Sequence, residues 1–127
     1  MGVVTLAGDR QSGKTHAALS VLAVDAMAGH RCVYQGFDLM VATAAYLRVC
    51  ELIPPDLVER YYRARGQQRI MLTNGGSVWF RSHRQTPITK GVHTYVVDDW
   101  LSGWLPPQVL ALPHVYVVEA SVEDVPL

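Results

Sequence analysis

Apolar residues along the chain alternate between short runs and longer stretches, which is the pattern of an α/β protein. Short, nearly continuous apolar runs rich in Val are typical of strands buried on both faces of a parallel sheet. Four such runs predict four parallel strands, at residues 3–7, 31–37, 94–97 and 115–118.

Two longer stretches predict helices. Residues 16–28 are rich in Ala, Leu and Val and contain no Pro or Gly before Gly29, which is expected to end the helix. Residues 39–52 follow Asp38, a good N-cap, and precede Pro54-Pro55, which cannot continue a helix.

The middle of the chain changes its pattern. We expect a shorter helix over residues 57–65, capped by Asp56 and closed by Gly66. Beyond it, residues 69–73 and 77–81 flank Asn74-Gly75-Gly76 and predict a β-hairpin. A single helical turn is expected over residues 108–112.

Residues 8–15 match the pattern G-x-x-x-x-G-K-[ST] of the P-loop, and they lie between a predicted strand and a predicted helix, as this motif requires. Glycines let backbone N–H groups turn toward a polyphosphate, and the helix N-terminus adds further donors. Lys14 is expected to reach the β- and γ-phosphates and the Thr15 hydroxyl to ligate Mg²⁺. The expected nucleotide-binding residues are Gly8, Asp9, Arg10, Gln11, Ser12, Gly13, Lys14, Thr15 and His16.

A P-loop needs an acidic partner for Mg²⁺, usually an Asp that ends an apolar strand. Val96-Val97-Asp98 fits this description, so Asp98 is the second expected Mg²⁺ residue. Asp99 stands where many ATPases have the Glu that activates the attacking water. Because Asp is one methylene shorter than Glu, slow hydrolysis is expected. Ligands of open α/β sheets bind at the carboxyl ends of strands, where Gly8, Asp98 and Ser121 are all expected.

The elements and the motif together predict one domain, residues 1–127, with the fold of a P-loop NTPase. That fold is a three-layer α/β sandwich with a mostly parallel sheet, here with an added β-hairpin. Apolar residues make up 50% of the chain, which is compatible with a packed core. No apolar run reaches the length of a membrane span and no leader precedes the first strand, so we expect a cytoplasmic protein without a membrane partner.

Charge is distributed unevenly although the formal net charge is zero. Residues 48–84 hold seven Arg against three acidic residues, whereas residues 85–127 hold one Lys against five acidic residues. The basic part is expected to face a nucleic acid, a phosphate or an acidic subunit, or to be an ordinary solvated surface. Trp79 and Phe80 alternate in the hairpin, so one of them is expected to face outward, as a base-stacking surface or as packing.

Cysteine and histidine residues indicate no further chemistry. Cys32 and Cys50 are expected to be reduced core thiols, because they form no metal-type cluster. The five histidines share no ligand spacing in the sequence, so a metal site built from them is not expected.

Four features, in this order, make the chain resemble the ATPase domain of the large terminase subunit of tailed bacteriophages, a RecA-like P-loop ATPase. They are the Arg within the P-loop (residues 10–15), the hairpin of residues 70–81, Lys90-Gly91 before the acidic strand, and Glu119-Ala120-Ser121 after the last strand.

The resemblance implies an ATP hydrolase that uses ATP and Mg²⁺. It implies that Lys14, Asp99 and Arg10 are catalytic, with Arg10 acting as an arginine finger in cis, or else pairing locally with Asp9. Lys90 and Ser121 would couple hydrolysis to movement. DNA, further copies of the chain and a partner subunit are the implied partners, and the host cytoplasm is the implied location of a phage-encoded protein.

The chain also departs from the family. Residues 1–127 include neither the family's adenine-holding segment nor its nuclease, and Lys-Gly replaces the usual Arg-Gly. We therefore expect a reduced relative of the motor domain. The first alternative is a nucleotide-binding or interaction protein that has lost turnover and acts with a partner subunit. The second is a small-molecule kinase with Arg60, Arg63 and Arg65 in a lid over the phosphates.

Overall fold

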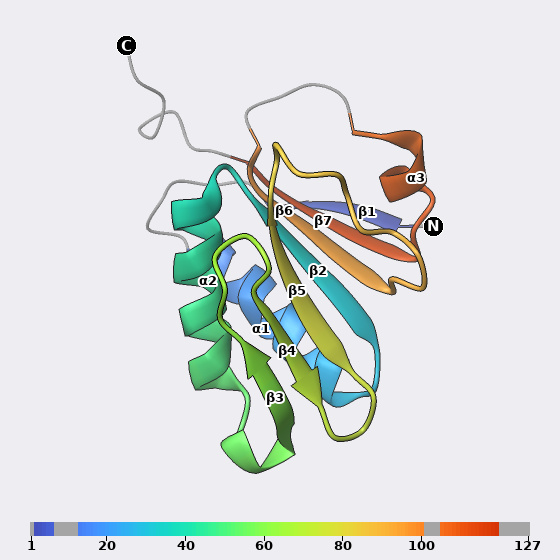
Figure 1. Ribbon diagram of the computed structural model, residues 1–127. Coiled ribbons are helices and arrows are strands. Elements are labelled where there is room, and N and C mark those ends of the chain that lie inside the picture. Colours follow the sequence, from blue (N-terminus) through green and yellow to red (C-terminus); the bar gives the residue numbers. More distant parts are fainter. Residues whose placement is uncertain (1, 7–12, 101–104, 120–127) are drawn as a thin grey trace.

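A seven-stranded β-sheet runs through the middle of the molecule, with strand order β1-β7-β6-β2-β5-β4-β3 (Figure 1). The computed structural model describes residues 2–6, 13–100 and 105–119. The strands are β1 (Gly2–Leu6), β2 (Arg31–Gly36), β3 (Val58–Tyr62), β4 (Arg69–Leu72), β5 (Ser77–Ser82), β6 (Thr94–Trp100) and β7 (His114–Glu119).

The four predicted parallel strands are confirmed and are neighbours in the sheet. Strand β1 pairs with β7, β7 with β6 and β6 with β2, all in parallel. Strand β5 continues this parallel part beside β2. The hairpin is also confirmed, since β4 runs antiparallel to β5. The α/β class and the mostly parallel sheet are therefore as predicted.

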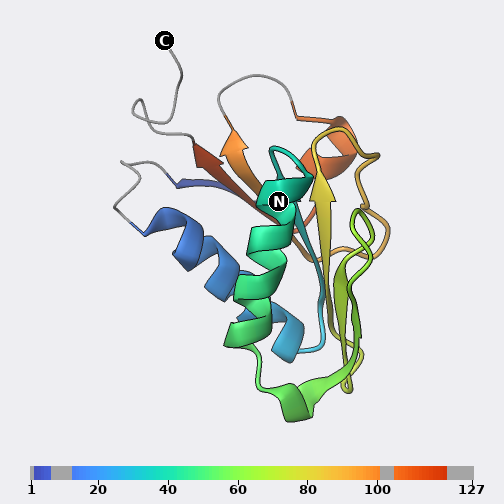
Figure 2. The ribbon, with the colours of Figure 1, turned by 60° about the vertical axis from the view of Figure 1, so that its left-hand side comes forward.

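Helices cover the two faces of the sheet unequally. Both long helices, α1 (Lys14–Met27) and α2 (Leu39–Leu52), lie on one face, and the short α3 (Pro107–Leu110) lies beside β6 and β7 on the other (Figure 2). The predicted cap of α2 is present, because the Asp38 side chain accepts a hydrogen bond from the Val41 N–H at 2.8 Å. None of the helices in the described ranges has the length and apolar character needed to cross a membrane.

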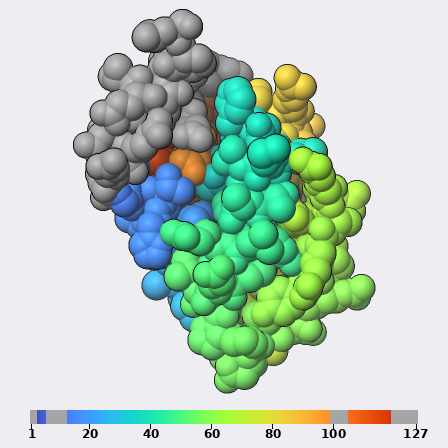
Figure 3. All heavy atoms as spheres, turned by 90° about the vertical axis from the view of Figure 1, so that its left-hand side faces the viewer, coloured from blue at the N-terminus to red at the C-terminus, as the bar shows by residue number. Residues whose placement is uncertain are grey.

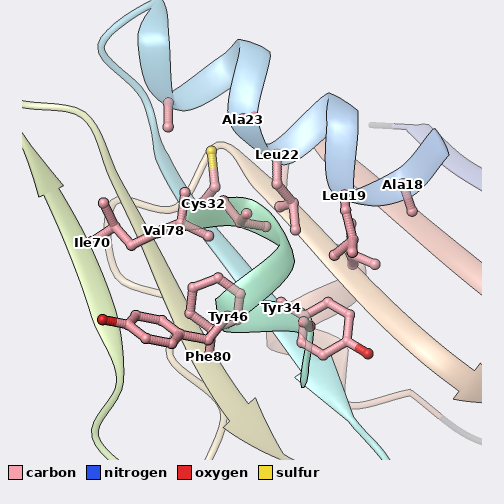
Figure 4. Packing of buried hydrophobic residues seen from close by; sticks show 14 of the residues in the cluster. Ala18, Leu19, Leu22, Ala23, Cys32, Tyr34, Tyr46, Ile70, Val78 and Phe80 are labelled. Atoms are coloured by element: carbon pink, nitrogen blue, oxygen red, sulfur yellow. The ribbon is translucent and has the colours of Figure 1, made fainter. Parts of the chain in front are cut away.

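The larger core cluster lies between the sheet and the two long helices. Small and branched side chains at helical spacing on α1, including Ala18, Leu22 and Ala26, are almost fully buried. They face side chains of β2, β4 and β5, among them Tyr34 and Phe80 (Figure 4). A second cluster on the opposite face joins α3 to β6 and β7.

The helix predicted over residues 57–65 is wrong. After the 3₁₀ turn η1 (Pro55–Leu57), the chain forms β3, which pairs antiparallel with β4. The sequence of β3, Val-Glu-Arg-Tyr-Tyr, is rich in β-branched and aromatic residues, and pairing with β4 decides its conformation. The arginine lid helix on which the kinase alternative was based is therefore not present.

The hairpin turn packs closely against the end of α1. The Asn74 side chain donates a hydrogen bond to the Met27 carbonyl at 2.8 Å and accepts one from the Gly76 N–H at 2.8 Å. A Cβ atom on Gly76 would lie 1.9 Å from the Ala26 carbonyl oxygen. Only glycine fits here, because backbone rather than a flexible side chain occupies the space. The Asn-Gly-Gly turn thus satisfies a helix carbonyl as well as reversing the chain.

Substituting Gly76 is expected to destabilise the fold. Gly76→Ala should lower the free energy of unfolding by about 1–3 kcal/mol or more, because α1 and the hairpin must move apart. Gly75→Asn is the control, since Gly75 has a φ of +91° but no atom within 4 Å of its Cβ position, and Asn tolerates that backbone region. Urea unfolding of both variants measures the effect. If both variants lost the same free energy of unfolding, the close packing of Gly76 against α1 would not be the cause of the destabilisation.

Candidate functional site

Helix α1 begins directly after Gly13, whose φ of +77° places it in the left-handed region. The Gly13 carbonyl accepts the first helical hydrogen bond, from the Ala17 N–H at 2.9 Å. Lys14 and Thr15 are therefore the first two residues of the helix, at the carboxyl edge of the sheet. Lys14 is largely buried, with 9% of its surface exposed.

Asp98 reaches the same place from β6. Side chains alternate along a strand, so Asp98 shares the helix-covered face with Val96, which belongs to the larger core cluster. The Thr15 hydroxyl donates a hydrogen bond to Asp98 Oδ1 at 3.3 Å, although the two residues are 83 positions apart. The two residues predicted for Mg²⁺ are thus brought together.

Tyr34 is a member of this site that the sequence did not reveal. Its hydroxyl donates a hydrogen bond of 2.6 Å to Asp98 Oδ2, in a buried environment. Each carboxylate oxygen of Asp98 therefore accepts a hydroxyl hydrogen bond, and the side chain is only 5% exposed. Short hydrogen bonds to a carboxylate are among the stronger ones in proteins, so Tyr34 fixes the orientation of Asp98, and the longer bond from Thr15 adds a weaker constraint.

A pocket of about 270 Å³ opens beside these residues, between α1, α2 and the end of β6. Figure 3 shows the two helices side by side on this surface, with a small part of β6 visible between them. Thr15, His16, Tyr34 and Asp98 line the pocket, together with apolar residues of both helices and Arg48.

Arg48 is the second residue that was missed. It is exposed on α2 and lines the pocket with Val41, Ala44 and Ala45, which share its helix face at intervals of three and four residues. A guanidinium at this position could donate hydrogen bonds to an anion in the pocket. The sequence shows the helical spacing of these four residues. It does not show that this face of α2 lines a pocket with α1 and β6.

Most of the other predicted site residues lie wholly or partly outside the part of the chain that the structure describes. Gly8, Asp9, Arg10, Gln11, Ser12 and Ser121 lie outside the described residues. The backbone of Asp99 is described within β6 but its side chain is not. Lys90 is exposed in the turn before the amino end of β6 and is not among the residues found to line the pocket.

The residues present fit a magnesium ion of the kind that P-loops hold. Mg²⁺ prefers oxygen ligands and usually keeps several waters, with one or two protein side chains and substrate phosphates completing its shell. A threonine hydroxyl and a carboxylate 3.3 Å apart are such a donor set. Within the described ranges, no group of three or more His, Cys, Asp or Glu is arranged to hold a metal ion.

Three of the five histidines form a row at the opposite edge of the sheet. The rings of His30 and His93 stack with centroids 3.7 Å apart, and His114 lies 4.5 Å from His93. Thr94 donates a hydrogen bond of 2.6 Å to Asp25, and its oxygen lies 2.8 Å from Nδ1 of His93. Burial, and then the neighbouring His30 and His114, hold the pKa of His93 below 6.5, against the attraction of Asp25.

The prediction of a core thiol holds for Cys32, whereas Cys50 is only partly buried and packs against the core. Both thiols are free, and burial raises the pKa of Cys32 to about 12, with Asp25 adding to the shift. Cys32 is therefore a buried, protonated thiol rather than a nucleophile.

Comparison of the chain with protein-family models, with curated proteins and with solved structures gave no match.

Tyr34→Phe should lower the free energy of unfolding by about 1.5–3 kcal/mol, because a buried carboxylate loses a hydrogen bond. Tyr46→Phe is a matched control from the same core cluster, since the buried Tyr46 hydroxyl has no oxygen or nitrogen partner among the described residues and is close only to the Cys50 thiol, a weak partner. That change should be nearly neutral. Urea unfolding at neutral pH compares the two, and equal effects would show that the Tyr34 hydroxyl does not hold Asp98.

Stability should also fall in mild acid. Because the pKa of His93 is lowered in the folded state, the unfolded chain binds the proton more readily, so folding weakens as pH drops through 6.5 and is strongest above it. In His93→Gln, the loss of unfolding free energy between pH 7.5 and 5.5 should be smaller than in the wild type. Urea titrations at the two pH values measure these losses. If the wild type and His93→Gln lose the same free energy of unfolding, His93 does not cause the fall in stability.

Proposed function

We propose that the chain binds Mg·ATP at the pocket between α1, α2 and β6 and hydrolyses it slowly, as a P-loop ATPase related to the motor domain of large terminase subunits. One observation carries the proposal, the hydrogen bond between Thr15 and Asp98. The P-loop pattern and the acidic strand were recognised separately in the sequence, and a magnesium site requires that their two side chains meet.

The surroundings of this contact support the same function. The N-terminus of α1, a helix of 14 residues, lies at the pocket, and a helix N-terminus favours phosphate through its dipole and its backbone N–H groups. Lys14 is at the first turn of that helix, and Arg48 adds a second cation from α2. Bound phosphates would therefore meet donors from two helices.

We assign the tasks from the motif and from the contact between Thr15 and Asp98. Lys14 would neutralise charge on the β- and γ-phosphates, and Thr15 and Asp98 would hold a Mg²⁺ ion, which would supply further positive charge to the phosphates. Tyr34 acts through Asp98, which makes it a positioning residue. The proposed base is Asp99, and its shorter side chain is the reason to expect slow turnover.

Titration calorimetry and phosphate release test the proposal. Wild-type protein should bind Mg·ATP, and Lys14→Ala or Asp98→Asn should weaken binding by about tenfold to a hundredfold, since each removes a charge-assisted contact. Arg63→Ala is a control for loss of a positive charge outside the pocket, and should bind like the wild type.

The outcomes separate binding from catalysis. No binding of Mg·ATP by the wild type would contradict the proposal as a whole. Binding without phosphate release above the Lys14→Ala background would retain the nucleotide site and reject the hydrolase. If the short carboxylate limits turnover, Asp99→Glu should raise the rate of phosphate release.

A further inference from the structure

The sheet has a second exposed surface, on the face opposite α1 and α2. Helix α3 lies beside β6 and β7 on this face, Ile88 and Val92 of the segment before β6 belong to the same cluster as Trp79, and no helix lies over β3 and β4 in Figure 1. Alternation along the strands sends Val78 and Ile70 into the core and places Trp79 and Arg69 on this open face. Of the two hairpin aromatics, Phe80 is buried and Trp79 is only half-buried.

Cationic and aromatic side chains alternate across this face. The guanidinium carbon of Arg69 lies 3.7 Å from the ring centre of Tyr62 and 4.7 Å from that of Trp79. Arg31 lies 4.7 Å from the Trp79 ring, and Arg60 lies 4.6 Å from the Tyr62 ring. We call this set the arginine–aromatic row; its members are Arg31, Trp79, Arg69, Tyr62 and Arg60.

Strand register produces the row. Arg69 is directly opposite Trp79 on β5 and directly opposite Tyr62 on β3, so the three side chains lie in line across the sheet. At a strand spacing of about 4.8 Å, β5 and β3 are about 9.6 Å apart, with Arg69 on the strand between them. Contact with the rings holds the guanidinium groups in place. Arg69 also donates a hydrogen bond of 3.3 Å from Nη1 to the Gln67 carbonyl, and its other N–H groups make no ion pair with a described carboxylate.

Over β2, β4 and β5 the charge of this face has one sign. Strands β2, β4 and β5 contain no Asp or Glu, and Glu59, the acid of β3, lies at the bulge where the register shifts. No ion pair joins Arg31, Arg60 or Arg69 to a carboxylate within the part of the chain that the structure describes. The row therefore offers positive charge that the protein does not neutralise there.

We propose that the arginine–aromatic row binds single-stranded nucleic acid. Arginines held at fixed spacing suit the phosphates of the backbone, and unpaired bases stack on guanidinium planes as well as on aromatic rings, without sequence preference. An acidic peptide would use the charges but not the rings. The surface lies on the opposite face from the nucleotide pocket, so this binding requires neither ATP nor Mg²⁺.

Fluorescence anisotropy with a labelled oligo(dT) of about 16 nucleotides tests the proposal, without nucleotide or Mg²⁺ and at low salt. Arg69→Ala should weaken binding about tenfold and reduce the slope of log affinity against log salt by about 0.7, as expected for one lost phosphate contact. Arg69→Lys keeps the charge but not the planar stacking group, and should fall between Arg69→Ala and the wild type.

Arg63→Ala is the matched control. Arg63 also lies over a tyrosine, Tyr61, but that ring packs against the core cluster on the helix side of β3. The two substitutions change the net charge equally, so the variants differ only in the face of the sheet from which the charge is removed. Arg63→Ala should leave the affinity within about twofold of the wild type, and thermal unfolding should show that both variants are folded.

Four outcomes would overturn the proposal. These are no binding by the wild type, equal losses in Arg69→Ala and Arg63→Ala, binding of a duplex of the same length as tightly as the single strand, and equal competition by inorganic polyphosphate. Self-association that Arg69→Ala abolishes, without oligonucleotide binding, would also overturn it and would make this face a contact between copies of the chain.

Discussion

Parallel pairing of β2, β6 and β7 is the constraint on which the rest of the structure depends. Parallel neighbours direct their carboxyl ends to one edge, and the chain must return between them through a crossover segment, such as the one that contains α3 between β6 and β7. The edge where these strands end therefore collects residues distant in sequence, including Thr15, Tyr34 and Asp98. The opposite edge collects the histidines that lie at the start of the same strands.

Much of this arrangement could be predicted because it depends on local patterns. Valine-rich runs identified the parallel strands, Asn74-Gly75-Gly76 identified the hairpin, and Asp38 identified the start of α2. The meeting of Thr15 and Asp98 followed from the rule that parallel strands end at one edge. Residues 57–65 were misjudged because Val58 to Tyr62 take their conformation from β4, a partner that no local pattern specifies.

The roles of Tyr34, Arg48 and the histidine row could not be predicted from local sequence patterns. Tyr34 reaches Asp98 because β2 is adjacent to β6 in a register that sets Tyr34 beside Val96. A prediction of strands alone gives neither the order nor the register. Arg48 depends on how α2 lies across the sheet beside α1. The histidines occupy unrelated sequence positions, and only the alignment of the strand starts brings their rings together.

Strand β2 explains how one small sheet holds two separate surfaces. It pairs with β6 on one side and β5 on the other, so its backbone is fixed along its length. Side chains alternate between its faces, so Tyr34 points to the helix-covered pocket while Arg31 lies in the row on the open face. The same rigid strand therefore supports both surfaces, and each keeps its geometry without help from the other.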